Sequence, residues 1–466
     1  MTDSNAAKTQ TSTVRNALLA AALLAVEFIA GTQAYLLRTV IPLVGADLDA
    51  REYYGVITGT TQVAMFVTMP LGPYLLQRFR VERLLVHLTW LSVVSGAVSA
   101  IAPTVGVFVL GRAGSGLASG ALATVSLAAI VTAMPPRWRR TVLAGYNLIW
   151  VFISLLAPVY AGWVASELSW RWALVLYLPL LVVARIVIAR QLTGTMQTGG
   201  QERLVVGSAL LLAGGVALLS LVGLRGLSAG VAIAVGIAGA AMAVFAGRRL
   251  LPAGTLSAAM RRPAAVATMG LVTGAYFGAA EIIGIIVHDL LGGTTGQVAL
   301  VLGGSGLGWA LAGLAAARWP AQAPRRYVHR STLGAGILSL GLLTTIATLL
   351  VDAMSRVEIV LIGWTAAGVG IGLVYLDTLN HIVDVPQEDD GVSPATAAAS
   401  TILVEAIATA VMGTLTTAGV GRAIAGGGGM AAAVVLLALC VVAAATIAWS
   451  ARRVHAARRA GTAAPC

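Results

Sequence analysis

Six ionisable side chains lie inside long apolar runs of this sequence: Glu27, Arg38, Arg112, Glu281, Asp377 and Glu405. Arg112 is the only charged residue between Arg83 and Arg137. In a bilayer, a charge near the centre costs about 2.5–3.5 kcal/mol on insertion scales. Groups kept at that depth face the interior of a helix bundle, where they serve a substrate or ion pathway or form an ion pair that locks two helices.

Two of these carboxylates have surroundings that suit proton exchange. Glu405 lies near the middle of its apolar run, with Thr401 and Thr409 about one helical turn away on either side. Glu281 and His288 share one helical face, so they could pass a proton through water, although His288 alone is more typical of a histidine near the membrane interface. A desolvated carboxyl can bind and release protons near neutral pH. The candidate proton-binding acids are therefore Glu27, Glu281, Asp377 and Glu405.

Composition shows what kind of chain holds these groups. Of its 466 residues, 58% are hydrophobic and 10% are charged, against about 25% charged in soluble domains. The chain is therefore an integral membrane protein. Its net charge of +12 comes from arginines in short gaps between apolar runs, a pattern typical of membrane topology and not of nucleic-acid binding.

Enzymatic and metal chemistry find little support in the sequence. The two cysteines, Cys440 and Cys466, predict neither a disulfide framework nor a metal cluster. The glycine-rich stretch at 303–308 lies inside an apolar run, which argues against a nucleotide loop. We expect no enzyme activity, no metal and no cofactor apart from protons as the coupling ion.

A helix needs roughly 20 apolar residues to cross the hydrocarbon, and that length predicts an all-α protein with about 14 spans. The expected spans are 17–42, 54–76, 83–102, 104–133, 141–166, 172–190, 203–224, 228–247, 264–290, 296–317, 331–351, 358–383, 394–418 and 427–450. Arginines concentrate in alternate loops, which predicts that both termini are cytoplasmic. We expect a multi-pass protein of the cell's inner (plasma) membrane.

Polar or basic stretches at 191–203 and 248–263 divide the chain into three parts. We expect an N-terminal six-helix bundle at 1–190, a linker with two additional membrane helices at 191–262, and a C-terminal six-helix bundle with a basic tail at 263–466. Two related halves are typical of secondary transporters. Small residues recur inside the spans, as in "GRAGSGLASG", and this spacing fits either tight static packing or surfaces that slide.

Several segments resemble the major facilitator superfamily, and in particular its fourteen-span drug:proton antiporter branch. The stretch "LGRAGSGLASGALATVSLAAIVTAMPPRWRR" resembles the fourth span and the loop after it, and "LSWRWALVLYLPL" resembles the junction of the fifth and sixth spans. Arg112 and Gly116 match an arginine and a glycine of that fourth span. The resemblance implies a major facilitator fold and a role for Arg112 in proton handling.

Other positions depart from the pattern of that branch. Gln77 replaces an aspartate in the loop after the second span, where Arg78 is kept, and both would belong to the inner gate. The fifth-span motif keeps Pro158 and Gly162 but has Ala157 and Ala161 where the branch has glycines. Gln33 stands where the branch has a first-span aspartate, so Glu27, Glu281 or Glu405 would take over proton coupling.

Together these features predict a proton-coupled exporter of drugs or other amphipathic small molecules, working as a monomer by alternating access. The expected cavity residues are Gln33, Tyr35, Arg38, Asn147, Trp150, Phe277 and Tyr375, with Asp377 beside them. Aromatic lining would suit amphipathic drugs, whereas Arg38 and Arg112 would suit an anionic natural product. The alternatives are an exporter of one metabolite, siderophore or lipid, an importer, or a membrane sensor that does not transport.

Overall fold

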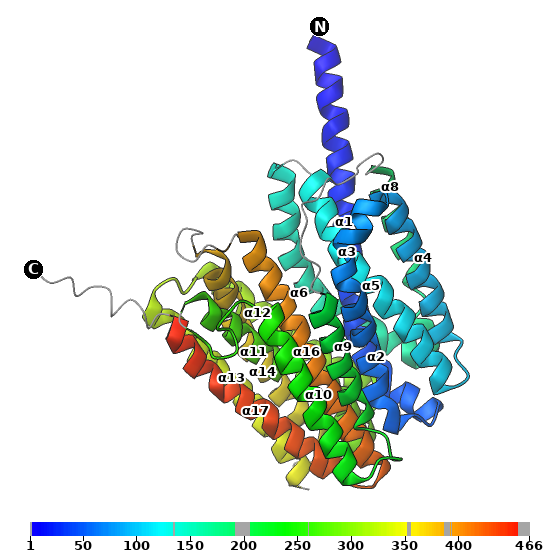
Figure 1. The fold of residues 1–466 in the computed structure, drawn as a ribbon, viewed down its shortest axis with the longest axis vertical. Helices are drawn as coiled ribbons and strands as arrows, with labels where there is room; N and C mark the ends of the chain where they lie inside the picture. The colour runs from blue at the N-terminus through cyan, green and yellow to red at the C-terminus, as the bar shows by residue number, and fades with distance from the viewer. Residues whose placement is uncertain are drawn as a thin grey trace, which may run out of the picture. The chain divides into compact units, whose positions relative to one another are not determined.

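The computed structural model describes residues 2–133, 136–191, 206–259, 261–351, 356–385 and 394–454, together with Val392. Every regular element in these ranges is helical, which confirms the all-α prediction. The chain forms two compact units (Figure 1). Unit 1 comprises Met1–Leu37 and Thr60–Leu210, and unit 2 comprises Arg38–Gly59 and Leu211–Cys466.

Unit 1 contains the first part of α1, the second part of α2, and the helices up to α8. The bounds are α1 (Thr2–Asp47), α2 (Tyr54–Thr68), η2 (Met69–Leu71), α3 (Gly72–Arg78), α4 (Val81–Ala100), α5 (Val105–Ala133), α6 (Pro136–Glu167), α7 (Trp170–Ala173) and α8 (Leu178–Gln191). The single span expected at 54–76 is divided into α2, η2 and α3. Pro70 lies in the 3₁₀ turn between the two α-helices and lacks the N–H that a continuous helix needs.

The small residues of α5 pack tightly against two neighbouring helices in unit 1. A side chain at Gly114 would collide with Ser95 on α4, and one at Gly116 would collide with the carbonyl oxygen of Thr61 on α2. The helix backbones are close here because these positions carry no side chain. These contacts show close packing in this arrangement, while sliding of these surfaces stays a prediction.

Unit 2 contains the end of α1, the start of α2 and the remaining helices. Their bounds are η1 (Arg51–Tyr53), α9 (Val206–Leu221), α10 (Ala229–Leu250), α11 (Arg262–Ile285), η3 (Ile286–Leu290), α12 (Thr295–Arg318), α13 (Pro324–Leu350), α14 (Val357–Val383), α16 (Pro394–Ala425) and α17 (Gly429–Val454). The first residues of α9, up to Leu210, belong to unit 1.

Helices α14 and α11 organise the packing of unit 2. Helix α14 packs against both α12 and α13, and α11 packs against α16 and α17. Glycines bring these backbones together: a side chain at Gly368 would collide with the Ser305 carbonyl on α12, and one at Gly341 of α13 with the Gly363 carbonyl on α14. Helix α11 is buried along nearly its whole length, so its ionisable Glu281 lies in the protein interior.

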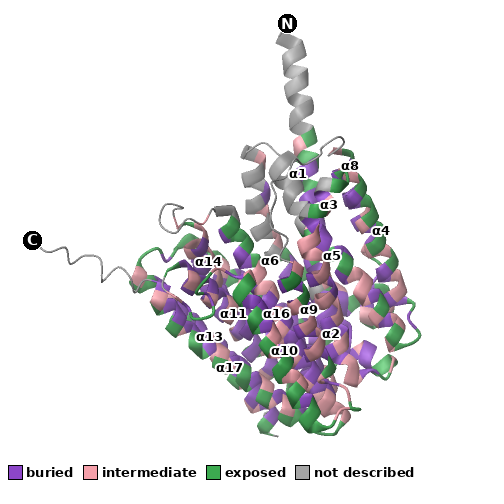
Figure 2. Cartoon of the chain, in the orientation of Figure 1, coloured by how far each residue is buried: buried purple, intermediate pink, exposed green. Residues whose placement is uncertain are grey.

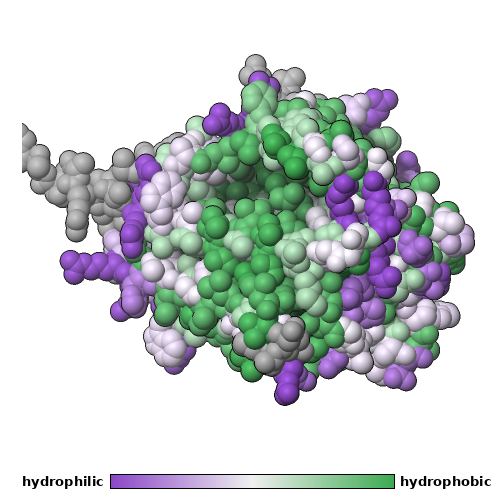
Figure 3. Space-filling model, turned by 90° about the horizontal axis from the view of Figure 1, so that it is seen from below, coloured by the Kyte–Doolittle hydropathy of each residue, from purple (hydrophilic) through white to green (hydrophobic). Residues whose placement is uncertain are grey.

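Eleven helices among the described residues are long and apolar enough to cross a membrane. Two apolar segments, Phe152–Glu167 and Val206–Leu221, are shorter. Helical structure occurs at each expected span position, while the number of about 14 membrane crossings stays a prediction. Exposed side chains recur along α13 and α17 (Figure 2), and several of them are apolar, among them Leu340 and Val442, as expected of helices that contact lipid. Figure 3 shows apolar groups also over much of the face seen from below.

Candidate functional site

A buried ion pair joins the end of α1 to α11 within unit 2. The Nε–H group of Arg38 donates to Oε1 of Glu281 at 2.7 Å, and the two side chains are only 7% and 10% exposed. Gly284, one turn beyond Glu281, makes this approach possible, because a side chain there would collide with the carbonyl oxygen of Arg38. Two residues that the sequence proposed for different roles therefore act on each other directly.

Aromatic side chains continue from this ion pair across α11, α12 and α14. The guanidinium carbon of Arg38 lies 5.0 Å from the ring centroid of Phe277, a cation–π geometry. The Phe277 ring packs against Trp309 with centroids 5.7 Å apart, and Trp309 packs against Tyr375 at 5.5 Å. Side chains from α1, α11, α12 and α14 thus form one connected row.

A second carboxylate lies at the far end of this row. The hydroxyl of Tyr375 on α14 donates to Oε1 of Glu405 on α16 at 2.8 Å. Phe277, Trp309, Tyr375 and Glu405 are all partly exposed, so a bound molecule can touch them. We call the six residues Glu281, Arg38, Phe277, Trp309, Tyr375 and Glu405 the polar–aromatic row.

A buried aromatic pair supports the row from behind. Tyr276 stacks on Trp364 with ring centroids 4.9 Å apart, and its hydroxyl hydrogen-bonds to Ser305 Oγ at 2.7 Å. The edge of Tyr276 also meets Trp309 at 5.5 Å. Tyr276 and Trp364 are 2% and 1% exposed, so they position the row and do not themselves meet a ligand.

The chemistry available to the row is electrostatic. A proton on Glu281 would cancel the negative charge that faces the buried guanidinium of Arg38. Removing one partner of a buried ion pair destabilises a protein by about 3–5 kcal/mol. Protonation therefore weakens the contact between α1 and α11. Among the described residues, no group of His, Cys, Asp and Glu side chains could hold a metal ion.

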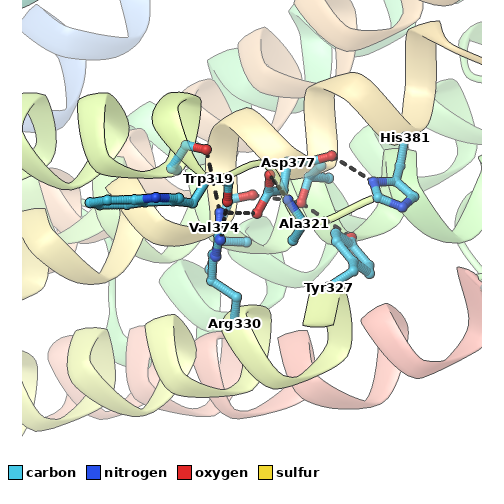
Figure 4. Close-up of polar contacts among 9 residues, drawn as sticks. Trp319, Ala321, Tyr327, Arg330, Val374, Asp377 and His381 are labelled. Atoms are coloured by element: carbon cyan, nitrogen blue, oxygen red, sulfur yellow. Dashed lines mark hydrogen bonds and ion pairs between the residues drawn. The ribbon is translucent and has the colours of Figure 1, made fainter. Parts of the chain in front are cut away.

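Asp377 lies in a different setting, shown in Figure 4. Arg330 of α13 donates to its Oδ2 at 2.8 Å, and the backbone N–H of Ala321 donates to its Oδ1 at 3.0 Å. Arg330 also donates to the carbonyl of Trp319 in the same loop. The Asp377 side chain is 2% exposed. These bonds tie α13, α14 and the loop between α12 and α13 together, and Asp377 contributes nothing to the polar–aromatic row. A role of Asp377 in proton coupling stays a prediction.

Another polar cluster surrounds Asp289 at the end of α11, where the helix finishes as the π-helical turn η3. The Tyr54 hydroxyl donates to Oδ2 of Asp289 at 2.6 Å, and Arg51 Nε lies 3.7 Å from the same oxygen. The His288 ring lies 2.8 Å from Oδ1. This cluster links η1 and α2 to α11, so it is a second attachment of the α1–α2 segment within unit 2.

The predicted residues Gln33, Tyr35, Glu27 and Arg112 lie in unit 1. The amide of Gln33 donates to the Tyr177 hydroxyl at 2.6 Å. Tyr35 is 3% exposed and packs in a cluster with Ile153 and Ala157. Glu27 on α1 and Arg112 on α5 are both half-buried.

The structure describes the surroundings of three of the four predicted gating residues. Arg78 is exposed at the end of α3 and donates to the Tyr74 hydroxyl at 3.0 Å. Pro158 and Gly162 are buried in α6, and the helix continues through the proline. The side chains of Gln77, Asn147 and Trp150 lie outside the described residues.

Sequence reasoning missed Trp309, although it joins Phe277 to Tyr375. It also missed Tyr177 and Arg330, the partners of Gln33 and Asp377. A tryptophan in the middle of an apolar run was a visible signal, because tryptophans of membrane helices concentrate at the interfaces. The pairings themselves join residues far apart in the chain and had no signal in a single sequence.

The profile of the Major Facilitator Superfamily matches residues 23–280. The chain belongs to the major facilitator superfamily. Solved structures agree at the level of the fold. One is a bacterial homologue of the human lysosomal transporter Spinster. The match extends over 94% of this chain and 97% of that chain, at a TM-score of 0.65 and 12% sequence identity. A POT family transporter in complex with 5-aminolevulinic acid matches 94% of this chain and 96% of its own chain, at a TM-score of 0.67 and 13% sequence identity.

The curated relatives of this superfamily member match only part of the chain, and at low sequence identity. The multidrug export protein EmrB of Haemophilus influenzae is 26% identical over 164 residues, which are 35% of this chain and 32% of that protein. The multidrug transporter protein MdtP of Bacillus subtilis is 22% identical over 207 residues, 44% of this chain and 38% of that protein. The chain therefore spans about a third of the length of these relatives.

Proposed function

We propose that this chain is a proton-coupled exporter of amphipathic small molecules, of the fourteen-span drug:proton antiporter branch, and that it works by alternating access. The observation that carries this proposal is the polar–aromatic row. Its two carboxylates, one of them paired with a buried arginine, are connected by partly exposed aromatic rings. The family and the multidrug relatives agree with it.

Glu281 is the coupling acid in this proposal. The residue that it binds, Arg38, is the first residue of α1 that belongs to unit 2, since α1 up to Leu37 belongs to unit 1. The ion pair therefore attaches the part of α1 that lies in unit 2 to α11. Protonation of Glu281 loosens this attachment, and release of the proton restores it, which gives protons control over a contact within unit 2.

Glu405 is the second acid, and the aromatic rings between the two acids receive the cargo. Trp309 offers a large apolar face, and the hydroxyl of Tyr375 holds Glu405 at 2.8 Å. Aromatic pairs and cation–π contacts contribute about 0.5–2 kcal/mol each, without requiring one fixed ligand shape. Such a surface suits a range of amphipathic molecules better than one polar metabolite.

The remaining roles are those expected from the sequence, apart from that of Asp377. Arg112 and Glu27 take part in proton handling, and Gln33, Tyr35, Asn147 and Trp150 belong to the cargo cavity. Gln77, Arg78, Pro158 and Gly162 serve the gates, while Asp377 acts as a structural joint. The protein is a monomer in the plasma membrane, with both termini cytoplasmic, and is organised as 1–190, 191–262 and 263–466.

The test is transport by the purified full chain in proteoliposomes with an imposed pH gradient. Ethidium and a panel of uncharged and anionic aromatic dyes serve as cargo. Gradient-dependent dye movement that stops on collapse of the gradient supports antiport. Movement that ignores the gradient would contradict proton coupling, and absence of movement for the whole panel would contradict multidrug export.

One relative gives a second candidate function. A transporter of the acurin A biosynthesis cluster of Aspergillus aculeatus is 24% identical over 153 residues, 33% of this chain and 28% of that protein. Export of a single anionic natural product would place Arg38 in contact with the anion. In the dye panel, selective movement of anionic dyes would favour this candidate over a multidrug exporter.

A further inference from the structure

A shallow pocket lies where the loop after α12 meets the start of α13 in unit 2. Its volume is about 470 Å³, and its lining residues are Trp319, Arg326, His329, Arg330, Leu333 and Leu373. It is formed by α13, α14 and the loop, and the polar–aromatic row contributes no residue to it. The volume is within the range of small-ligand sites, about 300–1,000 Å³.

The polar side of this pocket is basic. Arg326 and His329 are exposed on α13, while Arg330 turns inward to pair with Asp377 at 2.8 Å. None of the six lining residues is acidic, and the nearby Asp377 side chain is 2% exposed and covered by Arg330. The pocket therefore offers N–H donors and positive charge to an anion.

The apolar side of the pocket continues along α13. Leu333, Gly336 and Leu340 follow one another at helical spacing on one face, and the two leucines are 49% and 62% exposed. A side chain at Gly336 would meet nothing within 4 Å, so the surface is hollow there. Trp319 is 64% exposed at the basic end, a position typical of a tryptophan at the membrane–water interface.

We propose that this pocket binds an anionic phospholipid, with the phosphate on Arg326 and His329 and an acyl chain along Leu333, Gly336 and Leu340. The charge pattern selects an anion, and the adjoining apolar face selects one that carries a long hydrocarbon tail. Basic pockets between membrane helices at the cytoplasmic side are suited to anionic headgroups, and the positive-inside pattern predicts that side for this loop. A free phosphate would gain nothing from the leucine face.

The pocket and the contacts around Asp377 share one residue. Arg330 belongs both to the pocket lining and to the buried ion pair. A phosphate in the pocket places negative charge beside this guanidinium, so bound lipid helps to keep α13, α14 and the loop before α13 together. We expect the lipid to raise the thermal stability of the protein.

The test compares lipid retention by the purified full chain in detergent. Phosphatidylglycerol and phosphatidylcholine with identical acyl chains are added separately, and bound lipid is counted by native mass spectrometry while thermal unfolding is followed in parallel. Inorganic phosphate forms a third arm. The double variant Arg326→Gln/His329→Gln replaces both basic side chains by neutral amides, and Arg325→Gln is the matched control, because Arg325 is exposed on the same turn but does not line the pocket.

We expect wild type and Arg325→Gln to retain phosphatidylglycerol and to be stabilised by it. The double variant should bind it at least about tenfold more weakly, because its neutral side chains no longer give charge-assisted hydrogen bonds to the phosphate. Equal retention by the double variant would overturn the proposal. So would equal weakening by Arg325→Gln, equal binding of phosphatidylcholine, or equal stabilisation by inorganic phosphate. A second variant, Leu333→Gln, keeps the basic side chains and should also weaken retention if an acyl chain lies on α13.

Discussion

Replacement of Gly284 by alanine should separate α1 from α11 without touching a charged group. The new Cβ would collide with the carbonyl oxygen of Arg38 and lie 3.4 Å from Cγ1 of Val298. A carbonyl of a continuous helix cannot rotate away, so the two helices must move apart. Overpacking of this kind costs about 1–3 kcal/mol, which corresponds to a shift of about 5- to 150-fold between the packed and the separated arrangement.

Two spin labels within unit 2 can measure this shift. Asp49→Cys follows α1 and Gly296→Cys begins α12; both positions are exposed. The buried Cys440 is left in place and Cys466 is replaced by serine. Electron–electron distance measurements on the Gly284→Ala background should show a population at longer distance than in the parent protein.

The matched control is Gly313→Ala in the interior of α12, where an added Cβ meets nothing within 4 Å. Both substitutions replace glycine by alanine inside a helix and gain the same helix propensity, up to about 1 kcal/mol. Any difference between the two variants in the measured distances therefore comes from the collision at Gly284. Distance distributions for Gly284→Ala that coincide with those of Gly313→Ala would refute the argument that Gly284 controls the approach of α1 to α11.

Three further predictions concern other contacts. Asp377→Asn should lower thermal stability by removing the partner of Arg330, a loss of about 3–5 kcal/mol for a buried pair; full stability with lost proton coupling would instead return Asp377 to the coupling acids. Tyr375→Phe and Glu405→Gln should each slow gradient-driven efflux about tenfold, and the double variant no further, because both changes act on one charge-assisted hydrogen bond of about 1.5–3 kcal/mol: the first removes its donor and the second removes the charge of its acceptor; additive losses would contradict this. Arg422→Ala should speed hydrogen exchange in the α9–α10 loop, whose carbonyls accept from Arg422 at 2.5 and 2.6 Å; unchanged exchange would show that other contacts hold the loop.

The sequence predicted the helices and the residues with unusual chemistry because both depend on local information. A run of apolar residues predicts a helix, and an ionisable group within such a run predicts a buried contact. Arg38, Glu281 and Glu405 were identified in this way. The division of the 54–76 segment at Pro70 had a local signal as well, since proline interrupts the helical hydrogen bonds.

The partners could not be predicted, because each pairing depends on how distant helices pack. Arg38 and Glu281 are 243 positions apart, and Asp377 and Arg330 come from two helices that glycines bring together. Without these contacts Asp377 has the same pattern as Glu405, an acid within an apolar run. The structure separates the two: Asp377 is enclosed by Arg330 and a backbone N–H, whereas Glu405 is partly exposed and held by one tyrosine.

The central claim is that protons drive export through the ion pair of Glu281 with Arg38. Its most direct test is proton movement in proteoliposomes that contain a trapped pH-sensitive dye, recorded as cargo is added, for wild type, Glu281→Gln and the exposed control Glu358→Gln. We expect cargo-induced proton flux for wild type and Glu358→Gln and none for Glu281→Gln, in a protein that still folds. Cargo-induced proton flux of wild-type size in Glu281→Gln would contradict it.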